Sequence, residues 1–192
     1  MENIYNLTYE ELENFLIDNN QKKYRTSQIF EWLYDKRVSS YDEMTNLSKD
    51  LILLLKESFS IEKLEIVSQE IDTDVSKFLF KLKDKEHIES VLMRHNYGLS
   101  LCISSQVGCN MSCSLCESGR RKKVRNLSAY EMILQIMMIE ELIKEKITHV
   151  VIMGIGEPFD NFDNLVKFIK IANHHKALNI GSRHITVSTC GI

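Results

Sequence analysis

The chain has 192 residues, of which 44% are hydrophobic and 27% charged, and its net charge is -3. This composition is typical of a soluble globular protein, and the nearly balanced charge excludes a globally basic nucleic-acid-binding protein, so any RNA contact has to be local. No uncharged apolar run approaches the roughly 18 residues of a transmembrane helix, and no secretory signal opens the chain. We therefore expect a cytoplasmic protein without a membrane partner.

Residues 1–60 predict a small helical domain. Thr8 begins a capping-box pattern ahead of an apolar helix face, and Thr26 and Ser48 are the expected N-caps of two further helices. We expect Trp32 to be buried in the core, as large aromatic side chains usually are. The short helices and polar loops favour an accessory domain.

Residues 61–98 show the period of two that is typical of strands. Apolar and polar residues alternate over 77–83, and a turn separates this segment from a second expected strand at 88–93. Residues 64–71 are a possible third strand. We interpret the region as a small antiparallel sheet that links the helical domain to the cysteine-containing part of the chain.

Residues 99–192 alternate between strands and helices. This order is typical of βαβ units with a parallel sheet, whose active sites lie at the carboxyl ends of the strands. Three parallel strands cannot close a barrel, so we expect a partial barrel that belongs to a longer enzyme. The fold class is thus α/β: a partial (β/α) barrel preceded by a small helical domain and a short antiparallel sheet. The expected elements are strands 99–104, 150–153 and 185–188 and helices 128–144 and 164–174.

Three of the five cysteines lie close together as Cys109, Cys113 and Cys116, with the spacing Cys-x3-Cys-x2-Cys. Three thiolates can bind three irons of a 4Fe-4S cube and leave the fourth iron open to a substrate. The spacing alone leaves two alternatives open. A fourth thiol, Cys102 or Cys190, could complete a structural zinc site, or the cysteines could be buried thiols without a ligand.

Two further motifs surround this cysteine motif. Residues 154–158, Gly-Ile-Gly-Glu-Pro, follow an expected strand, and their glycines allow a ligand to approach the backbone closely. The carboxylate of Glu157 can accept hydrogen bonds from an ammonium group. Residues 120–123 and Arg125 carry five positive charges, which we interpret either as an RNA phosphate contact or as a solvated loop.

Together these motifs resemble the RlmN/Cfr family of radical S-adenosylmethionine (SAM) methyltransferases. The resemblance covers nearly the whole chain. It implies a radical-SAM barrel, a 4Fe-4S cluster and SAM as cofactors, and RNA as substrate. The segments that carry it are residues 24–29, 44–48, 88–91, 101–109, 125–128, 153–158 and 187–191.

The resemblance also implies a role for individual residues. The three cysteines of the motif match the cluster ligands, and Gly156, Glu157 and Ser188 match positions that contact SAM. Glu89 matches a general base, and Cys102 matches the cysteine that releases the methylated RNA through a disulfide. Without the resemblance, Glu89 would be interpreted as a solvated carboxylate and Cys102 as a buried thiol.

In this family one SAM methylates a protein cysteine, and a second SAM gives the radical that activates that methyl group for addition to an adenine. The implied function is methylation of carbon 2 of an adenine in 23S ribosomal RNA, and also in tRNA, by an enzyme that is monomeric at full length. A reductant such as flavodoxin is the implied electron donor. Carbon 8 is the alternative position.

The chain departs from the family in two respects. It ends after the third expected barrel strand, so the cysteine that carries the methyl group is missing, and we do not assign this role to Cys190. The second departure is the charged loop at 117–125. A second hypothesis is therefore a cluster-containing RNA-binding fragment that is catalytically incomplete, and a third is a structural zinc protein.

Overall fold

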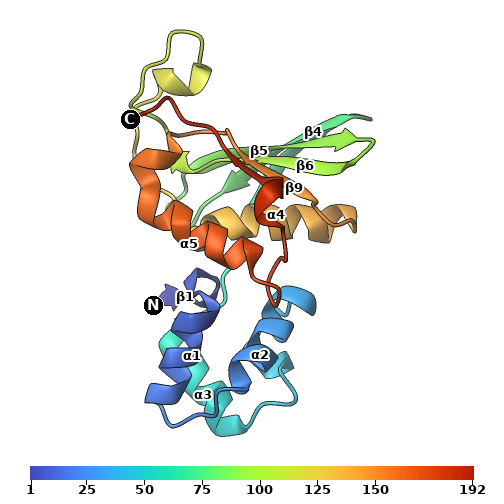
Figure 1. The fold of residues 1–192 in the computed structure, drawn as a ribbon, viewed down its shortest axis with the longest axis vertical. Coiled ribbons are helices and arrows are strands. Elements are labelled where there is room, and N and C mark those ends of the chain that lie inside the picture. Colours follow the sequence, from blue (N-terminus) through green and yellow to red (C-terminus); the bar gives the residue numbers. More distant parts are fainter. The chain divides into compact units, whose positions relative to one another are not determined.

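The computed structural model describes residues 1–192, which form two compact units. The first contains residues 1–62 and 170–179, and the second contains residues 63–169 and 180–192. Figure 1 shows residues 1–62 of the first unit in blue to cyan, and the sheet of the second unit in colours from green, through orange at β9, to red near the C-terminus. No helix combines the length and the apolar character that crossing a membrane requires. The predicted division at residues 60 and 98 stays a prediction.

The first unit is built from short helices. Two two-residue strands, β1 and β2, pair in parallel beside them. The elements are β1 (Glu2–Asn3), η1 (Ile4–Asn6), α1 (Tyr9–Asp18), α2 (Arg25–Phe30), η2 (Glu31–Asp35), η3 (Tyr41–Glu43), α3 (Lys49–Ser58) and β2 (Phe59–Ser60).

Side-chain caps explain where two of these helices begin. The Thr8 hydroxyl accepts from the N–H of Glu11 at 3.2 Å and the Glu11 carboxylate accepts from the N–H of Thr8 at 2.8 Å, which confirms the capping box. Ser48 caps α3 in the predicted way. The predicted cap at Thr26 is wrong, because α2 already begins at Arg25 and Thr26 is fully buried inside it.

Trp32 differs from the prediction in its burial. It lies in a π-helical turn, Glu31–Asp35, which continues α2. Within this turn Leu33 and Tyr34 point into the core, whereas Trp32 is half-buried, with the ammonium of Lys36 3.6 Å from its ring centroid. The prediction of core burial rested on the usual behaviour of aromatic side chains and is wrong here, because the indole lies at the surface, where its N–H donates to the Asn46 side chain at 2.6 Å.

The second unit is organised around one six-stranded sheet in the order β10-β9-β6-β5-β4-β3. Strand β6 is antiparallel to β5 and parallel to β9, so the predicted antiparallel strands and the parallel strands share one sheet. The strands are β3 (Glu65–Ile71), β4 (Val75–Lys81), β5 (His87–His95), β6 (Gly98–Ile103), β9 (His149–Ile152) and β10 (Ile185–Val187).

Helix α4 (Ala129–Ile143) covers one face of this sheet, as Figure 1 shows. Ile88, Ser90 and Leu92 of β5 are buried, and the Ser90 hydroxyl donates to the Gln135 side chain of α4 at 2.8 Å. The alternate residues of β5 are only half-buried. The period of two therefore sends successive side chains of β5 to α4 or to the open face.

The parallel strands are joined by helices, as predicted. Helix α4 connects β6 to β9, and α5 (Phe162–Asn173) connects β9 to β10. The carboxyl ends of these strands therefore meet at one edge of the sheet. The loop after β6 is closed at its base by β7 (Gln106–Val107) and β8 (Arg125–Asn126), which pair antiparallel. Short 3-10 turns η4 (Glu117–Arg120), η5 (Pro158–Asn161) and η6 (Ser182–His184) complete the unit.

Candidate functional site

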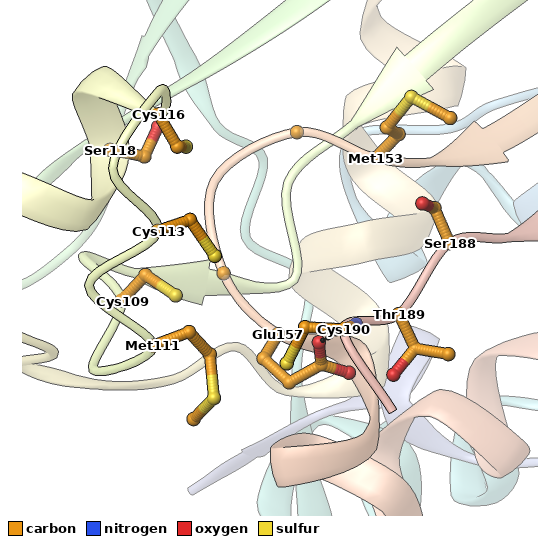
Figure 2. Close-up of a pocket in the computed structure, with 12 residues that line it drawn as sticks. Cys109, Met111, Cys113, Cys116, Ser118, Met153, Glu157, Ser188, Thr189 and Cys190 are labelled. Atoms are coloured by element: carbon orange, nitrogen blue, oxygen red, sulfur yellow. Dashed lines mark hydrogen bonds between the residues drawn. The ribbon is translucent and has the colours of Figure 1, made fainter. Parts of the chain in front are cut away.

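The loops that leave β7, β9 and β10 line one cavity of about 270 Å³ (Figure 2). All three segments that the sequence singles out contribute to it: the cysteine motif, the Gly-Ile-Gly-Glu segment and the segment after β10. The residues that line it are Cys109, Met111, Cys113, Cys116, Ser118, Met153, Gly154, Gly156, Glu157, Ser188, Thr189 and Cys190.

The cysteine loop is anchored at its base and exposed at its tip. Cys109 is 8% exposed, and its N–H donates to the carbonyl of Arg121 at 2.9 Å. Gly108 has a φ of 72°, and a side chain there would meet the carbonyl of Lys122. Farther along, Cys113 and Cys116 are exposed, and Leu115 is 101% exposed.

The donor set of this loop fits an iron–sulfur cluster. Cys109, Cys113 and Cys116 line the same cavity, and soft thiolates on one loop are the ligands such clusters take. No group of three His, Cys, Asp or Glu side chains is close enough to hold a metal ion in the structure. The three cysteines therefore share a cavity without meeting at one point.

The glycines of the second motif let this segment lie against the loop after β6. A side chain on Gly154 would come within 2.7 Å of the Ile103 carbonyl oxygen. Gly156 has a φ of 111°, and a side chain there would lie 2.5 Å from Cβ of Gln106. Both positions therefore require glycine, for packing against the protein as well as for any ligand.

Glu157 is a buried carboxylate with its hydrogen bonds already made. It is 4% exposed, and it accepts from the N–H of Phe159 at 2.9 Å and of Cys190 at 2.8 Å. Burial alone would raise the pKa of Glu157, but these N–H donors outweigh burial and lower its pKa below the ordinary value. The side chain is therefore ionised at neutral pH and suited to binding a cation.

A polar network behind Glu157 is the part of the site that the sequence did not predict. Gln106 is fully buried; it accepts from the N–H of Glu157 at 2.8 Å and donates to Asn126 at 2.8 Å and to Asp160 at 3.0 Å. Asn161 donates to the carbonyls of Ser105 and Leu127. In the sequence, this network was indicated only by the polar residues that follow the strands.

The segment after β10 completes the cavity. Ser188, which matches a SAM-contacting position, lines it beside Thr189 and Cys190. A hydrogen bond to Glu157, followed by burial, raises the pKa of the Cys190 thiol, which is therefore protonated at neutral pH. Figure 2 shows Cys190 beside Glu157 and Ser188 farther along the same segment.

Two predicted site residues lie elsewhere on the sheet. Glu89 and Cys102 belong to β5 and β6, outside the cavity lining, on the face that α4 does not cover. Glu89 pairs with Lys77 at 2.9 Å, and 41% of its side chain is exposed. Burial raises the pKa of the Cys102 thiol, and a hydrogen bond from the Met153 backbone opposes that rise. The predicted roles of both residues stay predictions.

Most of the positive charge after the cysteine motif is used inside the protein. Arg121 pairs with Glu86, Lys123 with Asp160, Arg125 with both Asp84 and Glu131, and Arg120 with Glu117. Lys122 is the one cation of this group without an ion pair. Only Lys123 and Arg125 are mostly covered in these pairs, whereas the Arg120 and Arg121 side chains are 79% and 58% exposed, so a structural role is supported for Lys123 and Arg125 alone.

Comparison with known proteins identifies both parts of the chain. Residues 2–61 match the family model of the ribosomal RNA large subunit methyltransferase N-terminal domain, and residues 103–192 match the radical SAM superfamily. Membership of that superfamily implies a 4Fe-4S cluster and SAM as cofactors.

Named relatives agree with both matches. The chain is 52% identical, over 98% of its length, to a probable dual-specificity RNA methyltransferase RlmN of Acholeplasma laidlawii, and 50% identical over its full length to one of Staphylococcus carnosus. It covers 56% and 54% of these relatives, about half their length.

A solved structure extends this agreement to the fold. The crystal structure of a radical SAM methyltransferase from Sphaerobacter thermophilus matches with a TM-score of 0.89 and 36% identity, over 100% of this chain and 58% of that one. The predicted α/β fold class is confirmed, and the chain belongs to the RlmN family of radical SAM proteins.

Proposed function

We propose that the protein of which this chain forms a part methylates an adenine of RNA at carbon 2. The observation that carries the proposal is the single cavity that brings the cysteine motif together with Glu157 and Ser188. The relatives from Acholeplasma laidlawii and Staphylococcus carnosus are probable dual-specificity RNA methyltransferases, which favours both 23S ribosomal RNA and tRNA as substrates.

In this proposal Cys109, Cys113 and Cys116 would hold the cluster, which when bound supplies an electron to SAM. Glu157 is placed to accept hydrogen bonds from the ammonium group of SAM, because its carboxylate is ionised and lines the cavity. Gly156 lines the same cavity, so its backbone can contact the ligand, and the Ser188 hydroxyl lies across the cavity from the cysteines.

Glu89 and Cys102 are proposed to act on the RNA and not on SAM. Both lie on the open face of the sheet, where Val91 pairs with Cys102 and is two residues from Glu89. A carboxylate there can take the proton of the adenine ring. The Cys102 thiolate can attack the sulfur of the methylated cysteine, so that an S–S bond forms while the S–C bond to the RNA breaks, and the departing methylene carbon keeps the electron pair and takes a proton to become the methyl group. Cys102 first has to lose its proton, because burial raises its pKa.

The experiment is methyl transfer by the full-length protein that contains this chain, reconstituted anaerobically, with SAM, a reductant such as flavodoxin, and RNA. Mass mapping of the RNA, with 2-methyladenosine and 8-methyladenosine as standards, identifies the modified carbon. We expect 2-methyladenosine. A product methylated at carbon 8 selects the alternative position, and SAM cleavage without any methylated RNA selects the catalytically incomplete fragment.

A matched pair of variants tests the assigned residues. Glu89→Gln keeps the shape of the side chain and removes the base, so we expect SAM cleavage to continue while RNA methylation falls about a hundredfold or more. Glu70→Gln, at an exposed carboxylate of β3, is the control and should retain activity. Equal RNA methylation by both variants would show that Glu89 is not the general base.

A further inference from the structure

Four aromatic rings gather at the edge of the sheet opposite the cysteine loop. His95 ends β5, Tyr97 lies in the turn to β6, His149 begins β9 and His184 ends the 3-10 turn before β10. We call these four residues the strand-start cluster. In Figure 1 the turn between β5 and β6 lies at the right, and the cysteine loop lies at the upper left.

The rings of this cluster form a connected array on the surface. His149 and His184 are stacked, with centroids 4.3 Å apart and planes 3° apart, and His95 and Tyr97 are stacked at 4.7 Å. Tyr97 meets His149 edge to face at 5.1 Å, which joins the two pairs. Tyr97 is 65% exposed, and His95 and His184 are also exposed.

Thr148 determines which nitrogen donates a hydrogen bond in two of these rings. Its hydroxyl lies 3.0 Å from the carbonyl oxygen of Leu99, which can only accept, so the single hydroxyl proton points there. The hydroxyl oxygen therefore accepts from Nδ1–H of His149 at 2.9 Å. Nδ1–H of His184 likewise donates to the Thr148 carbonyl at 3.1 Å. In the neutral form of each ring, Nε2 is then the nitrogen that can accept a hydrogen bond.

Several hydrogen-bonding atoms of the cluster have no partner within the protein. They are Nε2 of His149 and of His184, both ring nitrogens of His95 and the hydroxyl of Tyr97. Burial, and then the charges of His184 and His95, lower the pKa of His149, so its ring is neutral at pH 7. The array thus offers aromatic surface, hydrogen-bond acceptors and one hydroxyl.

Two exposed cations, Lys144 and Arg183, lie close to the cluster in sequence. The other two nearby cations are paired, Lys146 with Glu140 at 3.6 Å and Arg94 with Glu145 at 2.8 Å. A polyanion with planar bases complements such a surface, because cations bind its phosphates while aromatic rings stack on its bases. Two imidazoles with parallel planes do not aim their lone pairs at one point, which disfavours a metal ion.

We propose that the strand-start cluster binds single-stranded RNA nucleotides, at a site separate from the methyl-transfer cavity. The inference rests on the proposed function, since it gives an RNA-modifying enzyme a second contact with its substrate. Bases stack on the exposed rings, exocyclic amino groups or 2′-hydroxyls donate to the free Nε2 atoms, and Arg183 binds a phosphate.

The test uses the protein without its iron–sulfur cluster. Its affinity for a fluorescent single-stranded oligoribonucleotide is measured by fluorescence anisotropy. We expect the double variant Tyr97→Ala, His184→Ala to bind roughly tenfold more weakly, as the loss of base stacking predicts. Tyr97→Phe keeps the ring and should bind almost as the wild type does. Ile71→Ala is the matched control, because Ile71 is 68% exposed at the same edge of the sheet and carries no ring.

A second measurement separates binding from folding. In ¹⁵N spectra we expect His149 and His184 to be protonated at Nδ1, and RNA to shift their Nε2 signals, while thermal melts of the variants stay close to the wild type. Unchanged RNA affinity in the folded double variant would overturn the inference, as would a zinc-induced Nε2 shift without any RNA-induced one. RNA binding without methyl transfer by the reconstituted wild type would contradict only the proposed function.

Discussion

The two walls of the cavity are built in different ways. On one wall Glu157 and Gln106 are buried, and hydrogen bonds from distant parts of the chain fix their side chains. On the other wall the tip of the cysteine loop has only local contacts, such as the hydrogen bond from the N–H of Cys116 to the carbonyl of Cys113 at 3.1 Å and the exposed ion pair of Arg120 with Glu117. The protein's own contacts thus hold the wall that we propose binds SAM. The positions of the thiols at the loop tip, in contrast, depend on the group that they bind.

The largest effect is expected at the organised wall. Gln106→Ala removes an acceptor from the N–H of Glu157 and a donor from Asn126 and Asp160 in a buried setting. We expect the free energy of unfolding to fall by about 3 kcal/mol, because a fully buried side chain is removed and the buried N–H of Glu157 and two half-buried side chains lose their hydrogen bonds. Urea unfolding of the cluster-free protein measures this. The control Gln69→Ala, on an exposed strand, should change it by less than about 0.5 kcal/mol.

Glu157→Gln tests the charge on the same wall. An amide cannot accept from both N–H donors with the strength of a carboxylate, so we expect a loss of about 1–2 kcal/mol at pH 7. Because folding lowers the pKa of Glu157, its contribution is present above the unfolded-state pKa and is lost as the pH falls through the folded-state pKa. Urea unfolding at several pH values should therefore show the two proteins converging in acid; a constant gap would contradict this assignment.

Thiol reactivity compares the cysteine loop with the sheet. Only the thiolate reacts with iodoacetamide, and burial raises the pKa of Cys102, whereas Cys113 and Cys116 are exposed. We expect Cys102 of the folded, cluster-free protein to be alkylated about tenfold more slowly at pH 8 than the two loop cysteines. Peptide mass mapping against time measures the rates, and unfolding in urea should equalise them. Equal rates in the folded protein would place Cys102 in a different environment.

The smallest stability effect is expected at the loop. Cys113→Ser in the cluster-free protein should change the free energy of unfolding by less than about 0.5 kcal/mol, since the side chain is exposed. The same variant should lose the ability to hold a complete cluster. A large loss of stability in the protein without its cluster would show that the protein's own contacts hold the loop in place. The proposed difference between the two walls of the cavity would then be wrong.

Local signals made much of the fold predictable. The caps at Thr8 and Ser48 and the period of two in β4 and β5 depend on neighbours in sequence, so they could be interpreted directly. The joining of antiparallel and parallel strands at β6 depends on contacts far apart in the chain, and no local pattern encodes it.

The same distinction holds at the site. The spacing of the cysteines and glycines indicated which residues line the cavity, because the chemistry needs those residue types. The roles of Gln106 and Asn161 could not be inferred, since their partners lie tens of residues away. The basic stretch was ambiguous for the same reason: Asp84 and Glu86, which pair with two of its cations, belong to a distant turn.

Every interpretation of the site depends on one loop that we propose binds an iron–sulfur cluster beside a site for SAM. The decisive experiment is anaerobic reconstitution with iron and sulfide, followed by iron analysis and absorption spectroscopy with and without SAM. We predict about four irons per chain, thiolate-to-iron absorption near roughly 400 nm, and a change in the spectrum when SAM is added. A protein that binds no iron, or a cluster whose spectrum is unaffected by SAM, would contradict the account.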